Sequence, residues 1–404
     1  MRKAHDAWQR FRSYLDRDEH WHIGLMTGTS GDAIDAALVR FRGAGLDTTY
    51  ELRAYRETPF DDALRAEILA VAGAESTPLE RVMALDAALG HRYADAVESL
   101  LETAQLDASH VDAIGSHGQT VRHIPRAASD GGALTLQVGS AAILAERTGI
   151  TVVSDFRSRD TAAGGEGAPL VPLVDWWLFR SDAETRVMLN LGGMANITVV
   201  PKGGGPEAVV AFDTGPGNAV LDALAHAQSG GARRYDPGGA TAALGAASDA
   251  LLAELLADPF FAQAPPRSTG RERFGEHYAM KLREVGNAMG LSDEDVLATA
   301  VELTAASVAI SIQRFVMPPG EIGGVFASGG GVHNVTLMRA LERRLMPAPV
   351  RSLLSLGVKP ESKEALAFAF LAHQTLCGAP GNLPNATGAE RPVVLGHITP
   401  GAGS

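Results

Sequence analysis

The strongest constraint on this fold is a scheme of elements that occurs twice along the chain. Residues 23–41 predict an apolar strand, a turn of small and polar residues and an alternating return strand, and residues 187–200 repeat that order. Each half later has a strand that ends in a small polar turn, at 115–120 and at 328–334. A duplicated α/β domain predicts two similar lobes with a cleft between them. Such clefts suit enzymes that exclude water from a phosphoryl donor.

The chain has 404 residues, which is too long for one ordinary core and predicts two domains. We expect a polar extension over residues 1–20, a first lobe over 21–182 and a second lobe over 183–360. A final helix over 363–377 carries alanine and large apolar residues all round, which predicts burial on most sides. Residues 378–404 form the remaining tail.

Composition argues against several classes of function. The chain has 35 basic and 47 acidic residues and a net charge of −12, which disfavours binding to a nucleic-acid backbone. Cys377 is the single cysteine, so a disulfide framework and a cysteine-rich metal site are excluded, and we expect it in the core. The apolar runs are shorter than the ~20 residues that cross a bilayer, and the N-terminus lacks the apolar region of a secretory signal. We therefore expect a cytoplasmic protein with no nucleic-acid or membrane partner.

The two glycine turns are candidate anion-binding sites. The first, residues 27–32, offers backbone amides, hydroxyls and the carboxylate of Asp32, which can hold Mg²⁺, usually through water. The alternative is a plain hairpin turn made of turn-forming residues. Residues 192–196 are its counterpart in the second half, and two such turns favour a nucleotide. The sequence contains neither a P-loop motif nor a GxGxxG motif after its first strand.

Asp213 is a candidate general base. It follows a strand and precedes a predicted helix, and ligands of open α/β sheets bind at that edge. The alternative is a helix N-cap, since aspartate and threonine both cap well.

Two further loops carry concentrated polar side chains. Asp155, Arg157 and Asp160 follow another strand and precede a glycine-rich run. Arginine can hold a carboxylate and aspartate can accept hydrogen bonds from sugar hydroxyls, although a surface salt-bridge loop is the alternative. Residues 116–120 offer short polar groups of the kind that bind a polyol. His117 and His123 have no third ligand nearby, so we expect no zinc site.

Nine segments in chain order carry a family resemblance. They are GLMTGTSGDAID (24–35), GSHGQTVRH (115–123), VVSDFRSRDTAAGGEGAPLVPL (152–173), LNLGGMANIT (189–198), FDTGPGNAVLDAL (212–224), FFAQAPPRSTGRERFG (260–275), ASGGGVHN (327–334), KEALAFAFLA (363–372) and GNLPNATGA (381–389). In these segments the chain resembles the anhydro-N-acetylmuramic acid kinases of the sugar kinase/heat-shock 70/actin superfamily. The resemblance implies a two-lobed, duplicated ribonuclease H-like (actin-like ATPase) fold with an active-site cleft between the lobes. It also implies that the helix over 363–377 packs back on the first lobe, and that the protein is a homodimer.

The resemblance implies a reaction and a set of site residues. The family uses ATP to phosphorylate a 1,6-anhydro sugar while adding water at its anomeric carbon, which gives N-acetylmuramate 6-phosphate and ADP in peptidoglycan recycling. Asp213 matches the base that activates water, and Asp32 lies near Mg²⁺. The residues expected to bind ATP are Gly28, Thr29, Ser30, Gly31, Asp32, Ala33, Ile34, Asp35, Gly192, Gly193, Asn196, Gly329, Gly330 and Gly331. The residues expected around the sugar are His117, Gln119, Thr120, Asp155, Arg157, Asp160 and Glu364.

The sequence departs from the family pattern at three positions. The family usually has leucine at the position of Gly31 and glycine at that of Ala33, so nucleotide affinity falls if position 33 needs a positive φ. Arg267 replaces the usual lysine and changes the hydrogen-bond geometry while keeping the charge. Two other functions remain open: a kinase for another anhydro sugar such as levoglucosan, and a non-catalytic nucleotide-dependent binding module.

Overall fold

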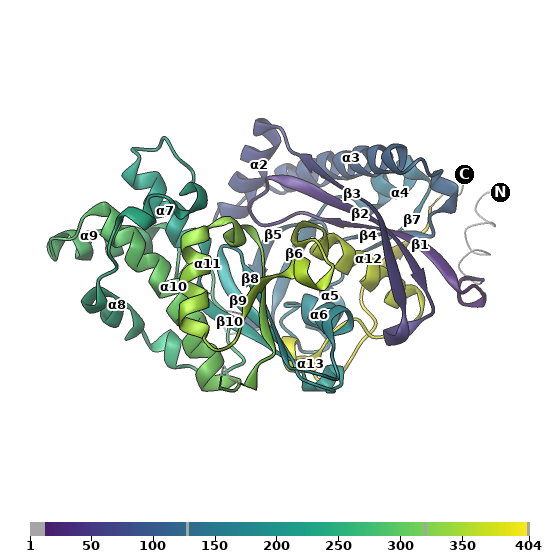
Figure 1. Ribbon diagram of the computed structural model, residues 1–404. Helices are drawn as coiled ribbons and strands as arrows, with labels where there is room; N and C mark the ends of the chain where they lie inside the picture. The colour runs from purple at the N-terminus through teal and green to yellow at the C-terminus, as the bar shows by residue number, and fades with distance from the viewer. Residues whose placement is uncertain (1–12, 127–128, 319–320, 402–404) are drawn as a thin grey trace. The chain divides into compact units, whose positions relative to one another are not determined.

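Two β-sheets with one shared strand order form the framework of the chain (Figure 1). The computed structural model describes residues 13–126, 129–318 and 321–401. The chain divides into two compact units. Unit 1 contains the described residues up to Val174 and those from Glu361 onward, and unit 2 runs from Asp175 to Pro360. The boundary lies inside helix α6 (Val171–Phe179).

Unit 1 is built on a six-stranded sheet of order β13-β7-β4-β1-β2-β3. Its strands are β1 (Glu19–Met26), β2 (Ala33–Arg42), β3 (Thr49–Pro59), β4 (Ala113–Ser116), β7 (Thr151–Ser154) and β13 (His397–Thr399). β1, β2 and β3 pair antiparallel, β4 and β7 continue parallel to β1, and β13 returns antiparallel along β7. A separate hairpin joins β5 (Gln119–Ile124) and β6 (Leu134–Val138).

The period of two along β1 separates the two faces of this sheet. Ile23 and Leu25 lie in the core that helix α3 (Leu79–Ala104) completes. Gly24, between them, faces helix α12 (Lys363–Leu376), where a Cβ would lie 1.8 Å from the carbonyl oxygen of Ala365. Gly115 on β4 has the same relationship to Phe368. These glycines let α12 lie directly on the sheet, so the helix expected over 363–377 packs on unit 1 (Figure 1).

Four shorter helices complete unit 1. They are α2 (Asp62–Gly73), α4 (Ala141–Thr148), α5 (Ser158–Ala162) and α13 (Pro384–Thr387).

Unit 2 repeats the order with a five-stranded sheet, β10-β9-β8-β11-β12. Its strands are β8 (Arg186–Leu191), β9 (Met194–Val200), β10 (Val210–Pro216), β11 (Gly324–Ser328) and β12 (Val350–Ser352). The first three pair antiparallel, and β11 and β12 continue parallel to β8, as in unit 1. The predicted α/β class and its duplicated ribonuclease H-like order are therefore confirmed.

The helices of unit 2 are α7 (Asn218–Gln228), α8 (Asp249–Leu256), α9 (Glu276–Ala288), α10 (Asp293–Phe315) and α11 (Val335–Leu345). Helix α10 is the hydrophobic centre of the unit. Within the described ranges it is long and apolar enough to cross a membrane, and the bent pair Pro237–Leu244 and Asp249–Leu256 passes the same test when taken together. The apolar window of α10 is 78% buried, as expected of a core helix.

The chain ends contribute more structure than the sequence predicted. β1 begins at Glu19, before the expected start of the first lobe, and Tyr14 is 2% exposed. Residues 1–12 of the expected extension lie outside the described residues. The tail supplies α13 and the edge strand β13. Strands β3, β5, β6 and β12 were not predicted, because they are short or exposed on one face.

Candidate active site

The first glycine turn joins β1 to β2 and takes its unusual backbone conformation at Gly31. Gly31 has φ of +60° and donates its N–H to the carbonyl of Gly28 at 3.1 Å. Ala33 already belongs to β2, opposite Pro59, and is not among the described residues with positive φ. The turn therefore needs a glycine at 31 and not at 33, and the alanine causes no backbone strain.

Two carboxylates of this turn have partners within unit 1. Asp32 is exposed, and its Oδ1 accepts a hydrogen bond from Nε of Arg65 at 2.6 Å. Asp35 accepts a hydrogen bond from the Tyr55 hydroxyl at 2.5 Å. Burial raises the pKa of Asp35 to about 6, the Tyr55 bond opposes that rise, and nearby carboxylates including Glu364 add to it.

The polar turn after β4 is tied to the first glycine turn. Nε2 of Gln119 donates to the carbonyl of Gly28 at 3.2 Å, and Oγ1 of Thr27 donates to the carbonyl of Gly118 at 3.1 Å. Thr120 follows on β5 and accepts a hydrogen bond from Gln137 at 3.2 Å. The two turns are therefore tied together by side-chain hydrogen bonds within unit 1.

A polar cluster next in unit 1 contains His117, Arg157 and Glu364. Nε and Nη2 of Arg157 lie 3.1 Å and 2.9 Å from Nε2 of His117, whose ring also packs against Phe368. Burial and the charge of Arg157 hold the pKa of His117 well below its usual value. Burial also lowers the pKa of Arg157 to about 10, and the charge of Glu364 in the first turn of α12 opposes that shift.

Asp155 and Asp160 differ in their surroundings. Asp155 has φ of +50°, a strained conformation of the kind that gathers at functional sites, and its Oδ1 accepts from the Ser158 hydroxyl at 2.7 Å. Asp160, expected at the sugar, is fully buried instead. Its oxygens accept hydrogen bonds from Asn382 at 2.6 Å, Thr387 at 2.7 Å and the amide of Gly167 at 2.8 Å. Asp160 thus anchors the C-terminal segment.

Two glycine-containing turns of unit 2, at residues 192–193 and 329–331, lie at the carboxyl end of β8. The amides of Gly217, Asn218 and Ala219, at the start of α7, donate to the carbonyls of Gly192 and Gly193. Asn218 also donates to the carbonyl of Leu191 at 2.9 Å. Residues 329–331 lie against the same strand end, since a Cβ on Gly329 or Gly331 would lie within 3 Å of Leu191. Asn196 pairs with Asn190 across the hairpin.

Asp213 stands opposite Asn196, where β10 breaks its regular pairing with β9. Its side chain is partly exposed, and Oδ2 accepts a hydrogen bond from the amide of Thr269 at 2.8 Å. Burial raises the pKa of Asp213 to about 6, while the Thr269 bond and the charge of Arg267 oppose that rise. The amide of Thr269 therefore holds the carboxylate in place, and burial shifts its pKa toward neutral pH.

Arg271 joins this group and was missed at the sequence level. Its Nε lies 3.7 Å from the position that a Cβ on Gly193 would occupy. Tyr55, Arg65, Asn218 and Thr269 were missed as well. Only the RSTGR run (267–271) carried a sequence signal, as a glycine-containing run with two arginines inside one of the segments that carry the family resemblance.

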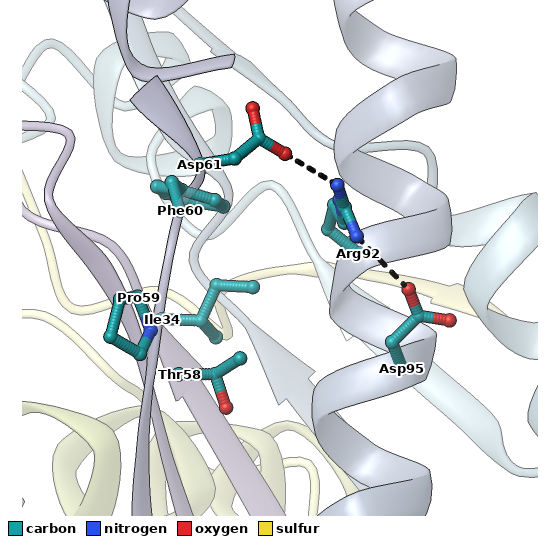
Figure 2. Close-up of a pocket in the computed structure, with 7 residues that line it drawn as sticks. All are labelled: Ile34, Thr58, Pro59, Phe60, Asp61, Arg92 and Asp95. Atoms are coloured by element: carbon teal, nitrogen blue, oxygen red, sulfur yellow. Dashed lines mark hydrogen bonds and ion pairs between the residues drawn. The ribbon is translucent and has the colours of Figure 1, made fainter. Parts of the chain in front are cut away.

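A pocket of about 160 Å³ in unit 1 is lined by seven residues (Figure 2). Ile34, Thr58, Pro59 and Phe60 line one side, and Arg92 bridges Asp61 and Asp95 on the other. Ile34 alone belongs to the expected site residues. Among the described residues no group of three or more histidine, cysteine, aspartate or glutamate side chains is arranged to hold a metal ion.

Duplicated ribonuclease H-like units with glycine turns at their first hairpins define the actin-like ATPase class of folds. Residues 20–401 match the sequence model of a protein family described as "Anhydro-N-acetylmuramic acid kinase". A relative of that name from Caldanaerobacter subterraneus subsp. tengcongensis is 42% identical over 96% of this chain and 99% of its own length. Another relative of that name, from Salinibacter ruber, is 45% identical over 93% of this chain and 95% of its own length. The chain belongs to the anhydro-N-acetylmuramic acid kinase family.

A solved structure, component A of (R)-2-hydroxyglutaryl-CoA dehydratase from Acidaminococcus fermentans, covers 88% of this chain and 99% of its own. It has 13% identity and a TM-score of 0.42, so it is too distant to add to the family assignment.

Proposed function

We propose that this protein uses ATP to convert 1,6-anhydro-N-acetylmuramic acid and water into N-acetylmuramate 6-phosphate and ADP. Family membership supports the kinase activity and the identity of the sugar. The raised pKa of Asp213, with its carboxylate held by Thr269, is the observation that carries the mechanism. A base that works near neutral pH is most effective with a pKa close to that pH. Burial raises the pKa of Asp213 to about 6 while Thr269 holds its carboxylate.

In this mechanism Asp213 takes a proton from water as the water oxygen bonds to the anomeric carbon. The bond between that carbon and O6 breaks, and O6 forms its new bond to the γ-phosphorus while the bond from phosphorus to the β-phosphate oxygen breaks. The proton rests on Asp213, and ADP leaves. The two events support each other because charge that develops on O6 passes to the phosphoryl group.

The remaining residues bind and orient the substrates. The first glycine turn (Gly28–Asp35) and Gly192, Gly193 and Asn196 hold the phosphates, and Gly329, Gly330 and Gly331 lie beside the adenosine. His117, Gln119, Thr120, Asp155, Arg157 and Glu364 face the sugar, and Arg157 is the candidate partner of its carboxylate. Asp160 acts indirectly, because its hydrogen bonds are used within the chain.

Mg²⁺ fits Asp32, an exposed carboxylate on the proposed phosphate turn, because magnesium keeps most of its water and needs only one or two protein carboxylates. It would neutralise charge on the transferred phosphoryl group. On family grounds we also propose a homodimer and a cytoplasmic role in peptidoglycan recycling.

A coupled ADP-release assay tests the function. Wild-type protein with ATP, Mg²⁺ and 1,6-anhydro-N-acetylmuramic acid should release ADP, and ¹⁸O from labelled water should appear at the anomeric carbon of the product. Asp213→Asn should lower kcat ~10²–10⁴-fold, the range that a positioned general base contributes. Turnover with levoglucosan only would reassign the substrate, and folded protein without sugar-dependent turnover would point to a binding module.

A further inference from the structure

A short segment lies along the open side of the edge strand β10 at Asp213. Asp213 pairs with Asn196 of β9, and the register shifts by a one-residue bulge before pairing resumes at Gly215. On the other side of β10, residues 267–269 bind Asp213. The amide of Asp213 donates to the carbonyl of Arg267 at 3.1 Å, and Nε of Arg267 donates back to the carbonyl of Asp213 at 2.9 Å. Thr269 then binds the carboxylate itself at 2.8 Å. The backbone of Asp213 is thus held by Arg267 and its side chain by Thr269, two residues of one short segment.

The rest of the Arg267 guanidinium anchors that segment. Nη1 donates to the carbonyls of Gln263 at 2.8 Å and Phe260 at 3.2 Å, and Nη2 donates to Oγ of Ser311 at 2.6 Å. These partners lie in the 3₁₀ helix Pro259–Ala262, just after it, and on α10. The guanidinium also packs on three rings, with centroids 4.9 to 5.3 Å away, those of Phe212, Phe260 and Phe315.

The charge of Arg267 acts on the same carboxylate. Glu272 is the other charged group that acts on Asp213, and its charge adds to the rise in the pKa of Asp213 that burial causes. Arg267 opposes that rise, and Arg314 faces Arg267. Removing the charge at position 267 therefore raises the pKa of Asp213 and leaves less of the base ionised near neutral pH.

We propose that Arg267 is a positioning residue for Asp213, which fixes the peptide of the base at the strand bulge and holds the segment whose Thr269 amide binds its carboxylate. The inference rests on the proposed role of Asp213 as the base. It gives a function to the position where this chain departs from the family's usual lysine.

The test compares two changes at Arg267 with matched changes at Arg273. Arg273 lies in the same loop, forms an ion pair with Asp258 and packs on Phe260 and Phe274, and these contacts within the described part of the chain do not include Asp213. Arg267→Gln removes the charge, and Arg267→Lys keeps the charge without the planar fork. The readouts are kcat/KM against pH, and a carboxyl-¹³C titration of Asp213 assigned by the loss of its signal in Asp213→Asn.

We expect Arg267→Gln to lower kcat/KM ~100-fold, since misplacing a reacting group by about 1 Å costs that much. The acid limb of its profile of kcat/KM against pH should move to higher pH, and so should the titration midpoint of Asp213. Arg267→Lys should recover part of the loss with the limb close to its wild-type position. Arg273→Gln and Arg273→Lys should lower the melting temperature and leave the limb unmoved.

The inference would be overturned if folded Arg267→Gln kept the wild-type kcat/KM and the wild-type titration midpoint of Asp213. It would also be overturned if Arg267→Lys had a kcat/KM no higher than that of Arg267→Gln. If Arg267→Gln does not fold, Arg267→Lys decides: a lower kcat with an unmoved limb supports the inference, and wild-type kcat or a moved limb contradicts it. Failure of the proposed function looks different, because wild-type protein would then not turn over the sugar. In that case the ¹³C titration still tests the coupling between Arg267 and Asp213.

Discussion

The guanidinium of Arg157 donates to Nε2 of His117 from two of its nitrogens, at 3.1 Å and 2.9 Å. Arginine has no acceptor, so Nε2 of His117 accepts and carries no proton. The ring is therefore neutral, with its proton on Nδ1. Burial and the charge of Arg157 also hold the pKa of His117 well below its usual value, which favours the neutral ring. His117 orients Arg157 and does not supply a proton near neutral pH.

Arg157→Met should raise the pKa of His117, because it removes a cation while burial continues to lower that pKa. The imidazole resonances of His117, assigned by their loss in His117→Gln, should show no titration between pH 8 and 6 in the wild-type protein. In Arg157→Met the midpoint should move upward, and kcat/KM for the sugar should fall ~10-fold or more as a charge-assisted bond is lost. Titration of His117 near pH 6.5 in the wild-type protein would contradict this assignment.

Gly31→Ala should destabilise unit 1 and weaken nucleotide use. A residue with a Cβ pays about 1–2 kcal/mol at positive φ, and here that Cβ would also lie 3.0 Å from Cγ2 of Ile68. We expect a lower free energy of unfolding in urea and a higher KM for ATP. Ala33→Gly is the control, because Ala33 already lies in a strand. A clear gain in ATP affinity in Ala33→Gly would show that position 33 limits the turn after all.

The positions of the glycine turns and of Asp213 could be predicted from sequence, because strands and small-residue turns are local patterns. Their partners could not. Asp160 was expected at the sugar, yet it binds Asn382 and Thr387, which lie 222 and 227 residues further along the chain. Arg267 was noted only as a departure from a family pattern, since its bonds depend on a strand bulge 54 residues away. Sequence thus predicts where polar turns follow strands, while tertiary contacts decide which of their side chains are used within the chain.

A buried cluster of Tyr14, His22 and His373 should make stability fall in acid. The Tyr14 hydroxyl lies 2.6 Å from Nε2 of His22 and 2.5 Å from Nδ1 of His373. Burial lowers the pKa of His373 to about 4, with His20 adding to the shift and Asp112 opposing it, and it lowers the pKa of His22 as well. Protonation therefore favours the unfolded chain, where the histidine pKa is ~6.5. The stabilisation is complete above pH 6.5 and declines as the pH falls toward 4.

Urea unfolding at pH 8, 6 and 5 measures this effect. His373→Gln should reduce the loss of unfolding free energy between pH 8 and 5, since one titrating group is gone. Tyr14→Phe should cost about 1–2 kcal/mol at pH 8, because it leaves buried ring nitrogens without a partner. His110→Gln, at an unburied histidine on the surface of the same unit, is the control and should change neither value. Identical pH dependence in His373→Gln and wild-type protein would exclude the cluster as the cause.

Arg271 should contribute to phosphoryl transfer, because its guanidinium lies beside Gly193 on the proposed phosphate turn. It is exposed and makes no ion pair within 4 Å among the described residues, so its charge remains available to a substrate. Its charge also opposes the burial that raises the pKa of Asp222 to about 6. Cationic groups on the transferred phosphoryl group contribute ~10³-fold or more to kcat. We expect Arg271→Ala to lower kcat ~10²–10³-fold at an unchanged melting temperature, and added guanidinium to restore part of that activity. Arg273→Ala is the matched change, and it should lose stability without any rescue by guanidinium. Wild-type kcat in Arg271→Ala would remove this arginine from the phosphate site and leave the glycine turns to hold the phosphates without it.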